Sequence, residues 1–153
     1  MIVDINPFKL FAPSAYWKLV AENNPILKEI CNGVGSRLSW TYHFTPDTIW
    51  GLNIKPAANI HDYQYTAPKV FPCIVDGETF NTGLDYKNHA DRVFLNNNIR
   101  IFEYHEALPG FTGWFHRRLA GVRRARAYEY YTILQKFGAT SFFADKNSKD
   151  TVV

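Results

Sequence analysis

The chain has 153 residues, of which 46% are hydrophobic and 16% aromatic, so it carries enough apolar surface for a folded core and is not a disordered chain. Its net charge of +3 is mild, and its two cysteines are too few for a disulfide framework, which excludes the small disulfide-rich class and favours reduced thiols. We expect a single domain over residues 1–153.

The start of the chain lacks the pattern of a secretion signal. Asp4 and Pro7 stand where such a signal needs a basic start and an unbroken apolar core. No stretch of the sequence approaches the roughly 20 apolar residues of a membrane span. The sequence therefore predicts a protein that is made and folds in a cytoplasm, without a signal peptide or a transmembrane segment.

The first predicted elements are a helical segment over residues 14–30 and a short strand. Ser14 precedes the apolar pattern and is the expected N-cap, while residues 23–25 interrupt the helix. The segment 31–35 then stops it. Residues 38–44 alternate between apolar and polar side chains, which predicts a strand with one buried face.

The central part of the chain is predicted to hold two helices joined by a hairpin. A proline suits the first position of a helix over residues 56–66. Within residues 70–80, Asp76-Gly77 lies between β-prone residues, which is the pattern of a tight hairpin. Apolar side chains at three- and four-residue spacing predict an amphipathic helix from about residue 84 to residue 103.

The C-terminal part is predicted to be a basic helix and a flexible tail. After Pro109-Gly110, a helix runs from roughly Phe115 to Phe137, with Gly138 as its C-cap. The tail is charged and has no apolar period. The expected segments are therefore a helical N-terminal part at 14–30, a site-bearing core at 31–104, a basic C-terminal helix at 111–138 and a flexible tail at 145–153.

Five arginines gather within ten positions of the basic helix. Either they contact phosphate groups, on lipid or on nucleic acid, or they form a solvated helix face. No nucleic-acid-binding motif accompanies them, so nucleic acid is the less favoured partner. The residues are Arg117, Arg118, Arg123, Arg124 and Arg126.

The residues with the clearest chemical potential lie in the predicted 56–66 helix. His61 and Tyr65 are four residues apart and share a helix face, while Asp62 projects about 100° away from His61. One helix thus presents an imidazole and a carboxylate to two neighbouring places. Alone, such a pair more often supports packing than catalysis.

Four features follow one another in an order that resembles the phospholipase A2 superfamily: a glycine loop, a His-Asp-x-x-Tyr helix, a hairpin, and a helix with a second aspartate. Here they are Gly33 and Gly35, His61-Asp62-x-x-Tyr65, residues 70–80, and Asp91. The stretch Asn88-His-Ala-Asp91-Arg-Val-Phe94 resembles the corresponding helix of the parvovirus capsid phospholipases. Small phage and prophage proteins share the His-Asp-Tyr-x-Tyr motif.

This resemblance covers about residues 31–94 and implies a mainly α fold. Two antiparallel helices would carry the site, a short β-hairpin would form a wing between them, and extra helices would stand at both ends of the chain. The resemblance also implies an activity, which is calcium-dependent hydrolysis of lipid esters of the phospholipase A2 kind. A phage or viral origin and association with a virion follow from the same likeness.

The roles of individual residues follow from the resemblance as well. His61 is expected to be the general base, with Asp91 holding its far ring nitrogen and Tyr65 hydrogen-bonding Asp91. The expected calcium ligands are the carboxylate of Asp62 and the backbone carbonyls of Cys31, Gly33 and Gly35. The ion would polarise the ester carbonyl and stabilise the oxyanion.

A lipid hydrolase implies a phospholipid membrane surface as its partner, bound peripherally. Arginines near an anionic surface and amphipathic aromatic side chains favour such binding. Trp114 and Phe115, beside the arginine run, would then seat in the headgroup region. The other reading places these aromatics in the core and the arginines in solvent.

Two other functions stay open. The first is a noncatalytic phage virion or tail component, with virion proteins as partners, which keeps the helical frame and uses the same histidine, aspartates and tyrosine as a buried polar network. Calcium binding separates it from the lipase. The second is a transition-metal hydrolase with His43, His61, His89 and Asp91 as ligands, although their spacing matches no compact zinc pattern.

Overall fold

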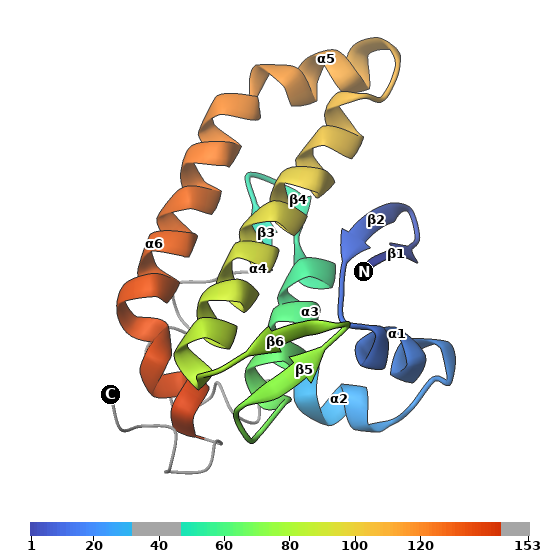
Figure 1. Cartoon of the computed structure of the whole chain (residues 1–153). Helices are drawn as coiled ribbons and strands as arrows, with labels where there is room; N and C mark the ends of the chain where they lie inside the picture. Colours follow the sequence, from blue (N-terminus) through green and yellow to red (C-terminus); the bar gives the residue numbers. More distant parts are fainter. Residues whose placement is uncertain (32–46, 145–153) are drawn as a thin grey trace.

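The computed structural model describes residues 1–31 and 47–144, and this part of the chain is mainly helical with short antiparallel hairpins (Figure 1). The expected fold class is thereby confirmed. The helices are α1 (Ser14–Ala21), α2 (Ile26–Cys31), α3 (Lys55–Thr66), α4 (Gly83–Glu106), α5 (Gly110–Arg118) and α6 (Ala120–Ala144). The strands pair as β1 (Ile2–Ile5) with β2 (Phe8–Phe11), β3 (Thr48–Ile49) with β4 (Leu52–Asn53), and β5 (Cys73–Val75) with β6 (Glu78–Phe80).

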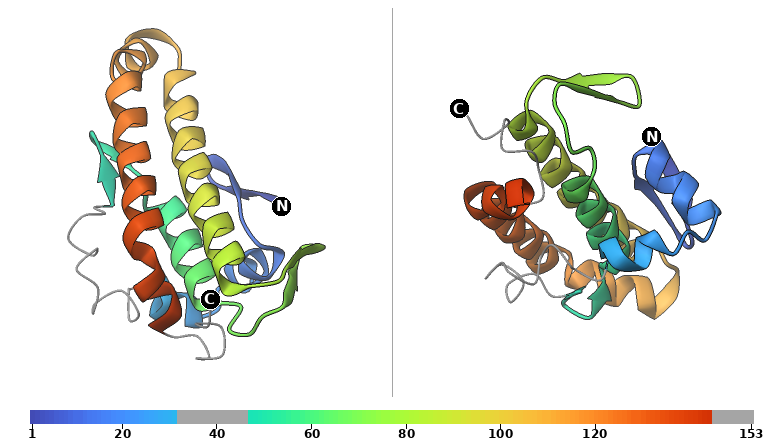
Figure 2. Two further views of the ribbon diagram at one scale, coloured as in Figure 1. Left: turned by 60° about the vertical axis from the view of Figure 1, so that its left-hand side comes forward. Right: turned by 90° about the horizontal axis from the view of Figure 1, so that it is seen from below.

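Helix α4 is the axis of the fold. Both α3 and α6 pack against it, and each runs in the direction opposite to α4 (Figures 1 and 2). Helix α5 lies across the far end of the α4–α6 pair (Figure 1). The predicted pair of antiparallel helices with a hairpin between them is therefore α3, the β5–β6 hairpin and α4.

Local sequence explains where α4 begins. The Thr82 side chain accepts a hydrogen bond from the Asp85 backbone N–H, and the Asp85 carboxylate accepts one from the Thr82 N–H, which together form a capping box. On the buried side of the helix, Ala90, Phe94 and Ile101 are at most 3% exposed. These apolar residues anchor α4 in the core, so its polar residues are held in fixed positions beside them.

The β5–β6 hairpin, which we call the wing, turns at Asp76 and Gly77, as predicted. Both residues have positive φ angles, 51° and 85°, as a tight two-residue hairpin turn requires. The Asp76 carboxylate accepts hydrogen bonds from the backbone N–H and the hydroxyl of Ser14. Ser14 is the first residue of α1, and the N-cap is Pro13. The prediction of Ser14 as the N-cap is therefore wrong.

The N-terminal hairpin β1–β2 was not predicted, and it packs on the second half of α4. The backbone N–H of Phe11 donates to Asn97 Oδ1 at 2.7 Å, and Asn97 Nδ2 donates to the Phe11 carbonyl at 2.8 Å. The buried amide of Asn97 therefore satisfies both backbone groups of Phe11 at the end of β2.

The helical segment predicted at 111–138 begins one residue from its predicted start, but it is not one helix and its predicted end is wrong. Two helices, α5 and α6, meet at Leu119, and α6 continues through Gly138 to Ala144. Gly138 is buried where α6 approaches α3, because a Cβ there would lie 2.6 Å from the Tyr65 hydroxyl. Its role is close packing and not capping.

Several predictions lie outside the described residues. They are the strand at 38–44, the tail at 145–153 and the glycines Gly33 and Gly35. Among residues 1–31 and 47–144, none of the helices combines the length and apolarity needed to cross a bilayer.

Candidate functional site

Asp91 of α4 is the centre of a buried polar cluster between α3, α4 and α6. It is fully buried, and its Oδ1 lies 2.9 Å from His61 Nε2 and accepts a hydrogen bond from the Tyr65 hydroxyl at 2.7 Å. The structure thus brings together the three residues that the sequence analysis named for catalysis. Helical spacing on α3 explains the geometry, since residues four apart point to the same neighbour.

Two further residues, which were not predicted from the sequence, donate hydrogen bonds to the second oxygen of the Asp91 carboxylate. Lys87 Nζ donates to Asp91 Oδ2 at 2.7 Å and to the Leu134 carbonyl at 2.9 Å. Gln135 Nε2, from α6, donates to the same Oδ2 at 2.6 Å. Asp91 therefore has four hydrogen-bonding neighbours, and α6 supplies one side of the cluster.

The cluster has a defined protonation state at neutral pH. Burial by itself would raise the pKa of Asp91, but the hydrogen bond and charge of His61 and the ammonium of Lys87 outweigh it and hold that pKa below its usual value. Burial, with the adjacent Asp91 charge, raises the pKa of Tyr65 well above its usual value. Asp91 is thus ionised, and Tyr65 stays a neutral donor.

An ionised carboxylate only accepts hydrogen bonds, so the His61 nitrogen that faces Asp91 is the one that carries the proton. In the neutral imidazole this leaves a lone pair on Nδ1, which makes no hydrogen bond to residues 1–31 or 47–144. The ring packs between Tyr65 and Phe94, at centroid distances of 4.1 and 5.0 Å, and its side chain is 9% exposed. Asp91 and the two rings therefore hold the His61 imidazole in one orientation, with Nδ1 on the side away from Asp91.

Asp62 belongs to a second, separate group. Its pKa is raised to about 6, chiefly by burial and further by the Asp47 charge, while His61 acts in the opposite direction. Burial and the nearby Asp62 raise the pKa of the Cys31 thiol to about 11. The Cys31 Sγ lies 3.7 Å from the Asn59 carbonyl. Cys31, at the end of α2, thus lies close enough to Asp62 for the carboxylate charge to affect its thiol.

This second group can be compared with the expected calcium site. Side chains from residues 1–31 and 47–144 form no cluster of three metal-ligating groups. The expected site needs one carboxylate and several backbone carbonyls, and the carbonyls of Gly33 and Gly35 lie outside the described residues. Asp62 suits a cation, because its carboxylate receives no hydrogen bond from the described residues and a second carboxylate raises its pKa.

The alternative transition-metal centre is not assembled by the described residues. His89 turns away from His61, since its Nδ1 lies 3.8 Å from Glu78 Oε2 on the wing. Its ring packs against Phe80 and Tyr86. His43 lies outside the described residues.

Four of the five clustered arginines make polar contacts within the protein, and Arg117 is one of them, because its Nη1 donates to the Glu106 carbonyl at 2.7 Å. Arg123 is 1% exposed and donates to the Trp50 carbonyl at 2.9 Å, and Arg124 forms a two-point ion pair with Glu106 at 2.6 and 3.0 Å. Arg126 pairs with Glu129 at 2.6 Å. The basic run is therefore not one continuous charged face.

Arg117 and Arg118 lie beside exposed aromatic side chains on α5. Phe111 is 76% exposed and stacks on Trp114, which is 46% exposed, and the Arg118 guanidinium lies over the Trp114 ring. We call this surface the α5 tip. It consists of Phe111, Trp114, Phe115, Arg117 and Arg118.

Comparisons with protein-family models, with curated proteins and with solved structures give no match to this chain.

Proposed function

We propose that the protein is a phospholipase A2-like hydrolase of lipid esters, with His61 as its general base. The observation that carries this proposal is the bonding of His61 Nε2 and the Tyr65 hydroxyl to one oxygen of Asp91, which leaves Nδ1 as the basic nitrogen. Such an orienting carboxylate fixes the tautomer of a catalytic histidine and stabilises the imidazolium that forms.

In this reaction His61 Nδ1 takes a proton from a water molecule as the water oxygen bonds to the ester carbonyl carbon. The carbon–oxygen bond to the leaving alcohol then breaks, and the imidazolium returns the proton to that alkoxide. The products are a fatty acid and an alcohol. Asp91 stabilises the transient imidazolium, and Tyr65 holds Asp91 in place.

Calcium is the proposed cofactor, and it would supply electrostatic stabilisation to the ester carbonyl. Asp62 would hold the ion through its carboxylate, together with backbone carbonyls of Cys31, Gly33 and Gly35. The raised pKa of Asp62, about 6, supports this assignment, because a buried carboxylate beside a second one is stabilised by a cation.

The proposed partner is a phospholipid surface, contacted through the α5 tip. Exposed aromatic side chains beside two arginines combine apolar insertion with attraction to anionic headgroups. Asp91 and Glu106 stand fifteen residues apart on α4, so the tip lies about 22 Å along the helix from the site. The tip would therefore tether the protein to the membrane through a surface that is separate from the site.

A second candidate function is favoured by Lys87 and Gln135. These two side chains satisfy the second oxygen of Asp91 without any ligand, as in a polar network that only fixes core geometry. In that case the protein is a noncatalytic virion or tail component, whose partners are other virion proteins.

One experiment separates the two candidates. Hydrolysis of phospholipid vesicles is measured with calcium for wild type, His61→Asn and the control His105→Asn, which changes a half-buried histidine near the far end of α4. Loss of a general base should lower the rate by about 100-fold or more in His61→Asn and leave His105→Asn active. No hydrolysis by wild type, with a lowered melting temperature in His61→Asn, would support the structural role instead.

A further inference from the structure

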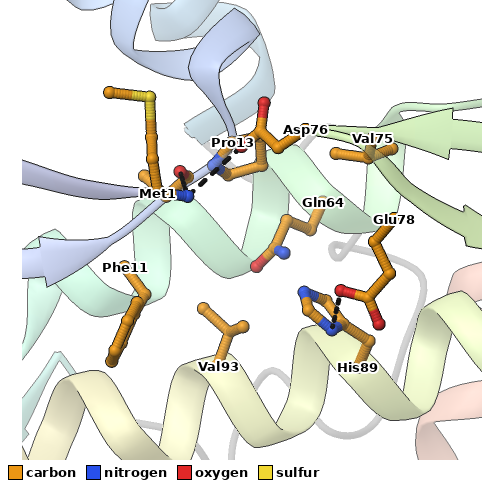
Figure 3. A pocket seen from close by; sticks show the side chains of 10 residues that line it. Met1, Phe11, Pro13, Gln64, Val75, Asp76, Glu78, His89 and Val93 are labelled. Carbon is orange, nitrogen blue, oxygen red and sulfur yellow. Dashed lines mark hydrogen bonds and ion pairs between the residues drawn. The ribbon is translucent and has the colours of Figure 1, made fainter.

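A cavity lies where the α3–α4 pair faces the N-terminal hairpin and the wing (Figure 3). Its volume is about 190 Å³. The proposed hydrolase uses none of its side chains. Its lining includes Phe11, Gln64, Glu78, His89 and Val93.

Gln64 is the first sign that this cavity binds a ligand. Its side chain lies in the middle of the ring of lining residues (Figure 3), it is 1% exposed, and its Oε1 has no hydrogen-bond partner. A hydrogen bond from Gln64 partly offsets the rise that burial causes in the pKa of Tyr86, so the amide nitrogen faces that hydroxyl. The unpartnered oxygen is costly to bury, and it lacks a donor.

The charges around the cavity favour a cation. The Glu78 carboxylate lies at its edge with a side chain 60% exposed. Burial lowers the pKa of His89, which Arg92 also lowers and Glu78 raises, so the imidazole is neutral near pH 7 and does not cancel the Glu78 charge. Asp76, also on the rim, accepts hydrogen bonds from Ser14 and pairs with the Met1 ammonium at 3.2 Å, so these two charges offset each other and the Glu78 charge remains.

One part of the cavity wall is apolar, and the cavity volume sets the size of the ligand. Phe11 and Val93 line the side opposite Glu78 (Figure 3). An apolar cavity of about 150 Å³ holds a benzene ring, so this one accommodates a ring with one small substituent.

We propose that this cavity binds a small organic cation, an amine with a ring-sized hydrocarbon part. Its ammonium group faces Gln64 Oε1 and the Glu78 carboxylate, and its hydrocarbon part lies against Phe11 and Val93. This site is independent of the proposed hydrolase, because it shares no residue with the His61 cluster.

Titration of the full chain with three ring compounds tests the chemical class. Cyclohexylammonium, cyclohexanol and cyclohexanecarboxylate share a ring and differ in charge, and amide chemical shifts report where each one binds. We expect saturable shifts around Gln64 and His89 with the ammonium, and binding about tenfold weaker or less with the other two, because only the ammonium brings charged donors. Equal binding of the alcohol, or no saturable shift with any compound, overturns the proposal.

Three variants test the two acceptors. Glu78→Gln should weaken ammonium binding by about threefold to fivefold, since Glu78 is exposed, and Gln64→Met by about tenfold or more. The control Glu103→Gln removes an exposed glutamate further along α4 and should change nothing. Equal affinity in Glu78→Gln and Glu103→Gln contradicts the proposal even where Gln64→Met fails to fold.

Discussion

The Lys87 ammonium lies 2.7 Å from Asp91 Oδ2, so the carboxylate that orients His61 has its counter-ion one turn away on the same helix. Both side chains are at most 1% exposed. The ion pair neutralises Asp91 without using the oxygen that His61 and Tyr65 contact. In the proposed hydrolase, the lysine thereby keeps a buried carboxylate ionised, and in a structural network it is the main electrostatic contact.

Lys87→Met should lower the free energy of unfolding by about 3–5 kcal/mol, because the variant keeps the side chain length and leaves a buried carboxylate without its cation. Urea unfolding at neutral pH measures this change. Lys136→Met, which removes an exposed lysine of α6, is the control and should stay close to wild type. A loss below about 1 kcal/mol in Lys87→Met would show that the other neighbours of Asp91 are sufficient.

Gly138→Ala should also destabilise the protein, by about 1–3 kcal/mol, because the added methyl group would lie 2.6 Å from the Tyr65 hydroxyl. Gly121→Ala is a matched control in the same helix, where an added Cβ meets nothing within 4 Å. Alanine is the better helix former, so that change should stabilise the protein by about 0.5–1 kcal/mol. Thermal unfolding compares the two, and equal shifts would mean that α6 does not approach Tyr65 closely.

The sequence predicted the contacts around Asp91 only in part. Helical periodicity puts His61 and Tyr65 on one face, whereas their meeting with Asp91 was expected from the family resemblance and not from spacing. Lys87 has the same four-residue spacing to Asp91, but a lysine is usually exposed and was overlooked. Gln135 is 44 residues from Asp91 and belongs to no local pattern.

Two errors in the fold have a similar origin. A glycine after a helical pattern usually marks the end of the helix, yet Gly138 lies inside α6 because of a tertiary contact that spacing does not reveal. The basic run looked like one charged face, but Arg123 and Arg124 bond to Trp50 and Glu106, which are distant in sequence. Long-range partners of polar side chains were the part that could not be predicted.

Membrane binding through the α5 tip should depend on Arg117 and Arg118, which are exposed, and on the ring of Trp114. Each arginine contributes about 1 kcal/mol near an anionic surface, so changing both to Gln should weaken binding to anionic vesicles by about 30-fold at low salt. Cosedimentation measures this, with Arg126→Gln as the control. Trp114→Ser should weaken binding further and reduce its dependence on lipid packing.

The distance between the tip and the site gives this prediction a second readout. Tip variants should lose hydrolysis of vesicles and keep hydrolysis of a soluble ester, because the site about 22 Å away is untouched. Equal vesicle binding by wild type and the tip variants would remove α5 as the membrane contact.

Asp62 should make stability fall as pH rises in the absence of calcium. Its pKa in the folded protein is about 6, above the usual 3.8, so the folded state holds a proton that the unfolded state releases between these values. The penalty is therefore absent below about pH 4 and complete above about pH 6 to 7. Asp62→Asn removes it and should stabilise the protein on the order of 2 kcal/mol at pH 7.5 but not at pH 4.

Urea unfolding at the two pH values, with a chelator present, measures this difference, and Asp4→Asn controls for the loss of an exposed carboxylate. Added calcium should then raise the stability of wild type at pH 7.5, because binding to the folded state alone shifts the equilibrium, and should leave Asp62→Asn unchanged. If calcium stabilises both proteins equally, Asp62 is not its ligand. If Asp62→Asn is less stable than wild type at pH 7.5, the carboxylate has a stabilising partner, and the proposed calcium site loses its main support.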